Sequence, residues 1–238
     1  MHPGSHYEHL AKLFDYPRHD YARWVLACYN LLEEEYPEAA AGIGRFARAL
    51  PTASEELTPE ALDEIQEIFT RTFDVQAVTT LGVGYVMFGD DYKRGEMLVN
   101  LSREMDATKV DYSDELPDHL PNVLRLMGRW EDRELAREFV EEILHPALAR
   151  MVSEFDAGRS DQRDQLYQKH YRTLIASSEK RRAMFREPLL AVTDVIRKDF
   201  NLSEWQPPEE KSDFLHAVRR ELEIESDDTV TPGKGAIK

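Results

Sequence analysis

Apolar side chains recur along most of the chain at the spacing of one helix face. Between residues 20 and 36 they fall at positions i, i+3, i+4 and i+7, the pattern of an amphipathic helix. The same period runs through residues 5–16, 37–50, 58–73, 92–105, 120–127, 131–155, 164–177 and 180–200. Helices of this kind bury their apolar stripes against one another. The sequence therefore predicts an all-α fold, a single globular bundle of about eight to ten helices.

Prolines and a capping threonine mark several of the expected helix boundaries. Thr58 precedes Pro59, so its hydroxyl is placed to accept a hydrogen bond from the first turn of a helix. Pro146 falls in the middle of a long periodic segment, where we expect a kink or a break. Pro188 is expected to interrupt the last periodic segment in the same way.

Residues 75–88 do not fit the helical period. Their apolar residues alternate from Leu81 to Met87, and Gly82 and Gly84 disfavour a helix. A strand needs a partner, and no other strand pattern is present in the sequence. We therefore interpret this stretch as a buried helix whose glycines allow close backbone packing.

Length and composition place most of the chain in one helical domain. The 238 residues, 42% of them hydrophobic, are sufficient to form a well-packed core. We expect the helical domain to cover residues 1–200. Residues 201–238 read as a linker-like C-terminal segment that holds a short amphipathic helix near Leu215 and a disordered end.

The chain is strongly acidic, with 46 Asp and Glu residues against 30 Lys and Arg and a formal charge of −16. This charge argues against binding to nucleic acid or to an anionic membrane, because both require a basic surface. It suits either simple solubility or a partner that presents a basic segment.

The sequence carries no signal for export or membrane insertion. The first ten residues are polar, unlike a signal peptide, and no apolar run reaches the roughly 20 residues of a membrane helix. Cys28 is the only cysteine, which excludes an intramolecular disulfide. It lies at helical spacing among apolar residues, so we expect a buried, inert thiol. We expect a cytoplasmic protein without direct membrane insertion.

The most informative stretch runs from Gly89 to Pro121. It starts with a turn at residues 89–91, continues with the predicted helix 92–105, and ends in the heptad ELPDHLP, Glu115–Pro121. Its two prolines stiffen the heptad, so its carboxylates and imidazole can be held ready for a ligand. In a second interpretation, Asp118 caps the next helix and the prolines only set the direction of the chain. The residues alone leave both interpretations open.

Four short motifs resemble those of one known protein family. They are Leu13–Pro17 (LFDYP), Phe73-Asp74, Gly89–Leu98 with its Arg94-Gly95 pair, and Glu115–Pro121. Their order and spacing resemble the NarJ/TorD family of molybdoenzyme-specific assembly chaperones, and most closely the NarJ, nitrate reductase delta-subunit-like branch. The likeness covers residues 10–130. Residues 75–87, VQAVTTLGVGYVM, depart from the nitrate reductase chaperones, so the resemblance does not name the client enzyme.

The resemblance implies a TorD/NarJ-like helical fold and a cytoplasmic chaperone function. Such a protein binds the apo catalytic subunit of a molybdenum/iron–sulfur oxidoreductase, through the N-terminal segment of that subunit, and holds it for cofactor insertion and assembly. It carries no permanently bound cofactor. Transient contact with molybdopterin guanine dinucleotide stays open, with Arg94 or Lys93 as the contacting residues, and the chain is expected to be a monomer or a dimer.

On this hypothesis, an apolar groove with an acidic rim binds a basic, amphipathic client segment. The predicted client-binding residues are Tyr85, Phe88, Asp90, Asp91, Tyr92, Arg94, Glu115, Leu116, Pro117, Asp118, His119 and Pro121. Arg94 is expected to pair with a carboxylate of the loop and to keep the site in shape.

Two other function classes compete with the chaperone. A helical adaptor with an unrelated client would use the same groove for a different peptide. An enzyme would need a site at Glu115, Asp118 and His119, but the sequence has no phosphate-binding glycine loop, no nucleophile elbow and no HExxH motif. We therefore predict a protein that is not an enzyme and that has no catalytic residues and no metal ligands.

Overall fold

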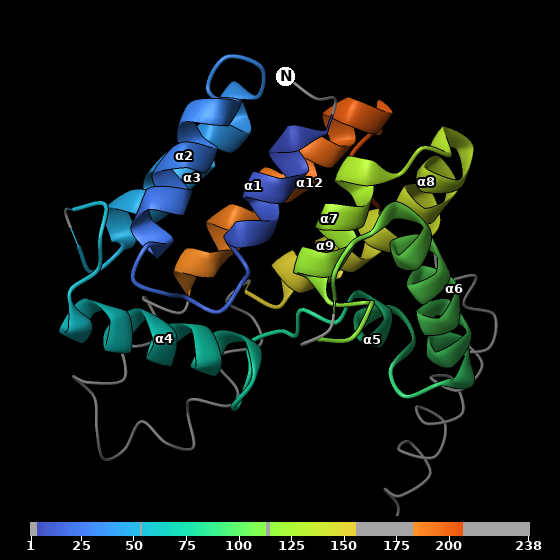
Figure 1. The fold of residues 1–238 in the computed structure, drawn as a ribbon, viewed down its shortest axis with the longest axis horizontal. Coiled ribbons are helices and arrows are strands. Elements are labelled where there is room, and N and C mark those ends of the chain that lie inside the picture. The colour runs from blue at the N-terminus through green and yellow to red at the C-terminus, as the bar shows by residue number, and fades with distance from the viewer. Residues whose placement is uncertain (1–3, 53, 113–114, 156–182, 207–238) are drawn as a thin grey trace, which may run out of the picture. The chain divides into compact units, whose positions relative to one another are not determined.

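The computed structural model describes residues 4–52, 54–112, 115–155 and 183–206. Its regular elements within these ranges are helices, and no strand occurs there, which confirms the all-α prediction (Figure 1). The helices are α1 (Ser5–Lys12), α2 (Tyr21–Leu32), α3 (Pro37–Ala49), α4 (Pro59–Phe73), α5 (Val83–Phe88), α6 (Tyr92–Thr108), α7 (Leu120–Arg129), α8 (Arg133–Phe139), α9 (His145–Ser153) and α12 (Arg186–Phe200), with a π-helical turn η1 (Val140–Leu144) and a 3₁₀ turn η2 (Ala183–Phe185).

Two of the predictions fall outside these ranges. The helix expected over residues 164–177 is one of them. The other is the helix and the end of the chain expected beyond Gln206. The described residues up to Trp205 belong to one compact unit.

The central helices pack through their predicted apolar faces. Helix α3 contacts α12 and α2, α1 contacts α7 and α2, and α9 contacts α12. In Figure 1, α4 runs across one end of α1, α2 and α3. An aromatic cluster secures it there: Phe69 and Phe73 of α4 lie with their ring centroids 5.6 and 5.2 Å from that of Phe185. These rings are buried, so α4 is fixed against the bundle and its C-terminal end is held in place.

The first turn of α4 forms as predicted. Thr58 has extended backbone angles, and its hydroxyl accepts a hydrogen bond of 3.3 Å from the backbone N–H of Ala61. Pro59 takes the first helical position, where its missing N–H leaves no hydrogen bond unmade.

The prediction of one helix over residues 75–88 is wrong for its first half. Residues 75–82 are irregular, and α5 begins only at Val83. The backbone groups of this stretch bond elsewhere: the N–H of Val78 donates to the carbonyl of Thr72 (2.9 Å), and the carbonyl of Leu81 accepts from Leu120 (2.8 Å). Close backbone packing at a glycine is confirmed, because a Cβ on Gly84 would lie 2.9 Å from a carboxylate oxygen of Asp118.

Neither interior proline breaks its helix. Before Pro146 the chain passes from α8 to α9 through the π-helical turn, and the N–H of His145 donates to the carbonyl of Val140, five residues earlier. Pro146 then lies in the first turn of α9, where it needs no donor. Pro188 also lies in a first turn, because α12 begins at Arg186, and the expected interruption is therefore absent.

Candidate functional site

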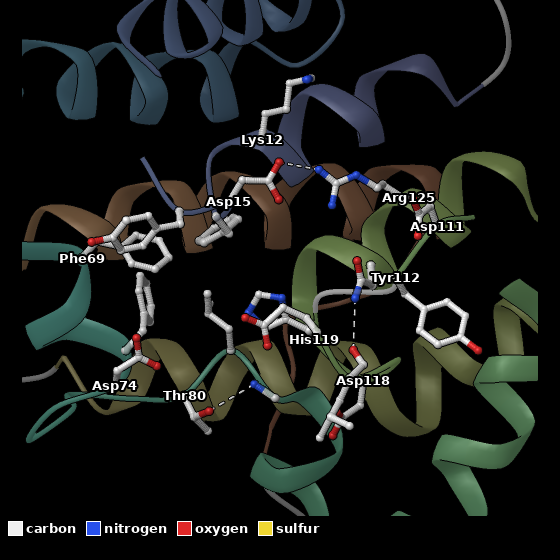
Figure 2. Close-up of a pocket in the computed structure, with 18 of the residues that line it drawn as sticks. Lys12, Asp15, Phe69, Asp74, Thr80, Asp111, Tyr112, Asp118, His119 and Arg125 are labelled. Carbon is white, nitrogen blue, oxygen red and sulfur yellow. Dashed lines mark hydrogen bonds and ion pairs between the residues drawn. The ribbon is translucent and has the colours of Figure 1, made fainter. Parts of the chain in front are cut away.

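A cavity of about 680 Å³ opens between the α1–α2 connection, the C-terminal end of α4, the start of α6 and the heptad loop before α7 (Figure 2). This volume lies within the range of about 300–1,000 Å³ that is typical of ligand sites. The charged residues that line it are the carboxylates Asp15, Asp20, Asp74, Asp111, Glu115 and Asp118 and the cations Lys12, Arg18, Arg94 and Arg125.

Backbone hydrogen bonds hold the heptad loop against the 75–82 segment. Gly82 and His119 form an isolated antiparallel bridge. In this bridge the N–H of Leu120 donates to the carbonyl of Leu81, and the N–H of Val83 donates to the carbonyl of Asp118, both at 2.8 Å. The segment with alternating apolar residues around Gly82 therefore pairs with the heptad loop at a single bridge. This pairing holds the loop in place as one wall of the cavity.

An ion pair joins the same loop to α6. The carboxylate of Asp118 accepts hydrogen bonds from Nε of Arg94 at 2.9 Å and from its Nη2 at 3.4 Å. The Asp118 side chain is 1% exposed and that of Arg94 is 19% exposed, so water screens the pair only weakly. The expected pairing of Arg94 with a loop carboxylate is confirmed. The alternative role of Asp118 as a helix cap is wrong, because its carboxylate is used by Arg94 and α7 has no side-chain cap.

Two of the other cations of the wall, Arg125 and Lys12, have partners. The guanidinium of Arg125 bonds to the carboxylate of Asp15, and its Nε lies 3.4 Å from Glu8 (Figure 2). Lys12 lies with its ammonium 3.7 Å from the centre of the Trp24 ring. The contact of Arg125 neutralises the carboxylate of Asp15, and the contact with the Trp24 ring holds the Lys12 ammonium.

Two carboxylates of the cavity are left over. Within the described ranges, the side chains of Asp74 and Glu115 have no hydrogen-bond or salt-bridge partner. Both act electrostatically on His119, which Figure 2 shows in the middle of the site. Burial lowers the pKa of the His119 imidazole below its usual 6.5, and it outweighs the opposing effect of the nearby carboxylates, of which Glu115 is the strongest. At neutral pH the imidazole is therefore uncharged. The six carboxylates that line the cavity outnumber its four cations, so the site favours a cationic ligand.

Aromatic and aliphatic side chains supply apolar contact beside these charges. Tyr16 is 52% exposed and packs edge-on against Phe69 at 5.7 Å between ring centroids. Leu116, also 52% exposed, lines the cavity together with Tyr112. Exposed apolar side chains around unpaired carboxylates can bind an amphipathic ligand with a positive group.

The structure brings five of the predicted site residues into this cavity: Arg94, Glu115, Leu116, Asp118 and His119. Pro117, in the loop itself, and Pro121, in the first turn of α7, are buried and do not line the cavity. Tyr85 lies beside the site, since its ring centre is 5.3 Å from the Arg94 guanidinium.

The remaining four predicted residues do not line the cavity. Phe88 is the last residue of α5, and Asp90 lies in the turn between α5 and α6. Tyr92, the first residue of α6, is 71% exposed. Asp91 caps α6, because its carboxylate accepts from the N–H of Lys93 at 2.9 Å.

The predicted set of site residues omits several residues that line the cavity. The missing residues include Asp15, Tyr16, Asp74, Tyr112 and Arg125. The signal for three of them is present in the sequence, because Asp15 and Tyr16 belong to the LFDYP motif and Asp74 follows Phe73. Nothing local in the sequence marks Tyr112 or Arg125.

The remaining predictions concern Cys28, metal binding and membrane insertion. Cys28 is buried, as predicted, and burial raises the pKa of its thiol to about 12. In the part of the chain that the structure describes, no three His, Cys, Asp or Glu side chains are grouped to hold a metal ion. No helix in the same part is long and apolar enough to cross a membrane. A scan against protein-family models and a search of curated proteins gave no match to this sequence.

Proposed function

We propose that the protein is a cytoplasmic assembly chaperone of the NarJ/TorD type, which binds the catalytic subunit of a molybdenum/iron–sulfur oxidoreductase before its cofactors are inserted. One observation carries the proposal. Three motifs that resemble this family, at residues 13–17, 73–74 and 115–121, come from distant parts of the chain and line one cavity, together with Arg94 of the fourth. A shared binding role is the simplest reason for that convergence.

The proposed ligand of the cavity is a basic, amphipathic segment near the N-terminus of the client. Asp74 and Glu115 would take the positive charge of the segment, because their carboxylates are not paired within the described residues. Tyr16, Phe69 and Leu116 would cover its apolar side chains. The Arg94–Asp118 pair would keep the loop in place and stay intact in the complex.

Binding of this kind would hold the client until its molybdenum cofactor and iron–sulfur clusters are inserted, and release would follow. The chaperone itself would catalyse no reaction. Contact with molybdopterin guanine dinucleotide would be transient, and Lys93, an exposed cation next to Arg94, could make it.

Calorimetric titration with the N-terminal peptide of a molybdenum subunit encoded beside this chain tests the proposal. The peptide should bind saturably, a scrambled peptide should not, and added salt should weaken binding. Asp74→Asn and Glu115→Gln should each raise the Kd several-fold. Asp63→Asn is the matched control, because Asp63 is an exposed carboxylate of α4 that lies outside the cavity.

Failure of the folded protein to bind the peptide would exclude the cavity as the site for this segment. Co-purification from the native host would then decide whether the chain associates with a molybdenum subunit at all. Recovery of an unrelated partner would show that the protein is a helical adaptor and not a chaperone for a molybdenum subunit.

A further inference from the structure

A second groove lies away from the first cavity, between α6 and the continuous α8–η1 helix. It has a volume of about 430 Å³. Its apolar lining consists of Met97, Leu101, Trp130, Leu135, Phe139 and Ile143.

The α8–η1 helix carries two apolar stripes, and only one of them is fully buried, while Phe139 and Ile143 of the other stripe pack against the edge of the core. Ala136, Val140 and Leu144 are fully buried. The second stripe faces the groove: Leu135 is 38% exposed, and Phe139 and Ile143 are partly exposed. A helix with one solvated face needs one apolar stripe. The part of the second stripe that stays exposed therefore indicates a contact beyond the core.

The rim of the groove is acidic. Glu104, Glu138 and Glu142 line it, against the single cation Arg103. Glu104 also accepts a hydrogen bond of 2.9 Å from the indole N–H of Trp130, which fixes the ring in the groove wall. Glu138 and Glu142 are exposed and have no salt-bridge partner within the described ranges. Their charges would attract a basic partner.

The π-helical turn contributes to this surface. Glu142 and Ile143 both lie in η1, so the turn that accommodates Pro146 also shapes one wall of the groove. From Leu135 to Ile143 the exposed stripe is about 12 Å long at 1.5 Å per residue. That length matches about two turns of a docked helix.

We propose that the groove between α6 and α8 is a second docking site, and that its ligand is a short basic amphipathic helix of a partner protein. The site is separate from the cavity of the proposed function and does not depend on that function. Its apolar floor would bury the apolar face of the partner helix, and Glu138 and Glu142 would pair with Lys or Arg side chains at the edge.

Trp130 can report on this groove alone. The chain has three tryptophans, and the full-length variant Trp24→Phe/Trp205→Phe leaves Trp130 as the only one. The probe is a synthetic Leu/Lys peptide with Leu at i, i+3, i+4 and i+7. We expect a saturable change in Trp130 emission. A Leu/Glu peptide with the same Leu positions should give none, and a scrambled Leu/Lys peptide should bind more weakly.

Substitutions on α8–η1 locate the contact. Glu138→Gln/Glu142→Gln should raise the Kd several-fold, and Glu134→Gln/Glu141→Gln, which removes two charges of the same helix outside the groove, should leave it unchanged. Leu135→Ser should raise the Kd about tenfold, because a buried leucine contributes on that scale.

Four results would overturn the proposal, the last of them a dimer of the chain. One is an unchanged emission of Trp130 with every peptide, and another is equal binding of the Leu/Glu peptide. The third is loss of the Trp130 signal in Asp74→Asn/Glu115→Gln, which would place the peptide in the first cavity. A concentration-dependent dimer that changes Trp130 emission without peptide would assign the groove to a second copy of the chain instead.

Discussion

Arg94 and Asp118 are 24 positions apart in the sequence, and their two hydrogen bonds tie the first turn of α6 to the loop that closes the cavity. Removing one partner of a buried pair leaves the other charge without compensation, which costs about 3–5 kcal/mol. Since Arg94 retains some contact with water, we expect Asp118→Ala to lower the free energy of unfolding by about 3 kcal/mol. Urea denaturation measures this change.

A double-mutant cycle with Arg94→Ala serves as the control for that loss. If the pair is responsible, the double variant should be less destabilised than the sum of the two single variants. Additive losses would show that Asp118 stabilises the loop through other contacts.

Replacement by alanine is expected to have opposite effects on stability at Gly84 and at Gly95. A Cβ on Gly84 would overlap with the end of the Met97 side chain and lie 2.9 Å from the Asp118 carboxylate, whereas nothing lies within 4 Å of a Cβ on Gly95. Gly84→Ala should destabilise the protein by about 1–3 kcal/mol through overpacking. Gly95→Ala should stabilise α6 by up to about 1 kcal/mol, because Ala favours a helix over Gly.

Thermal unfolding of the two variants checks the pair of predictions. A Gly84→Ala protein as stable as the parent would mean that Met97 and the loop move aside at no cost. The Arg94–Asp118 geometry would then not depend on the glycine.

His119 makes stability depend on pH. Burial lowers the pKa of its imidazole in the folded state below the usual 6.5, so the unfolded chain binds more protons between the two values. Stability should therefore be complete above pH 6.5 and decline as the pH falls through the folded pKa. His119→Gln should decline less over that window. NMR titration of His119 gives its pKa directly, and a value above 6.5 would contradict the expected sign.

The helices could be predicted from the sequence because each amphipathic helix carries its own signal. The spacing of apolar residues and the cap at Thr58 depend on neighbours a few positions away. The 75–82 segment could not be assigned in this way, because the carbonyl of Leu81 bonds to Leu120, far along the chain. A local pattern of alternating residues cannot distinguish a helix from a segment that pairs with one distant residue.

The candidate site shows the same limit. The unusual composition of the heptad loop predicts a binding site, and four of its residues do line the cavity: Glu115, Leu116, Asp118 and His119. The acidic turn at Asp91 also predicts binding residues, but the carboxylate of Asp91 caps α6 instead. Arg125 sits on a regular helix and reaches the cavity only because α7 packs against α1. Tertiary packing decides which polar side chains share a site.

Asp199 joins the C-terminal end of α12 to α1 and to the start of α3, and its removal should loosen that junction. Its carboxylate accepts from the hydroxyls of Tyr7 (2.7 Å) and Tyr36 (2.5 Å), and Nε2 of His6 lies 2.9 Å away. Burial favours a raised pKa for Asp199, but these hydrogen bonds outweigh it and hold the pKa below the usual 3.8. Its stabilising effect is therefore present above pH 3.8 and is lost as the pH falls through the folded pKa. At neutral pH, Asp199→Asn should lower the free energy of unfolding by about 1.5 kcal/mol, because hydrogen bonds to a charged acceptor are stronger than those to an amide.

Asp194→Asn is the matched control on the same helix: burial raises the pKa of Asp194, so the fold disfavours its charge and the amide should cost nothing. Urea denaturation of both variants at neutral pH measures the free energy of unfolding. Equal losses in the two variants would mean that the negative charge of Asp199 does not stabilise the fold.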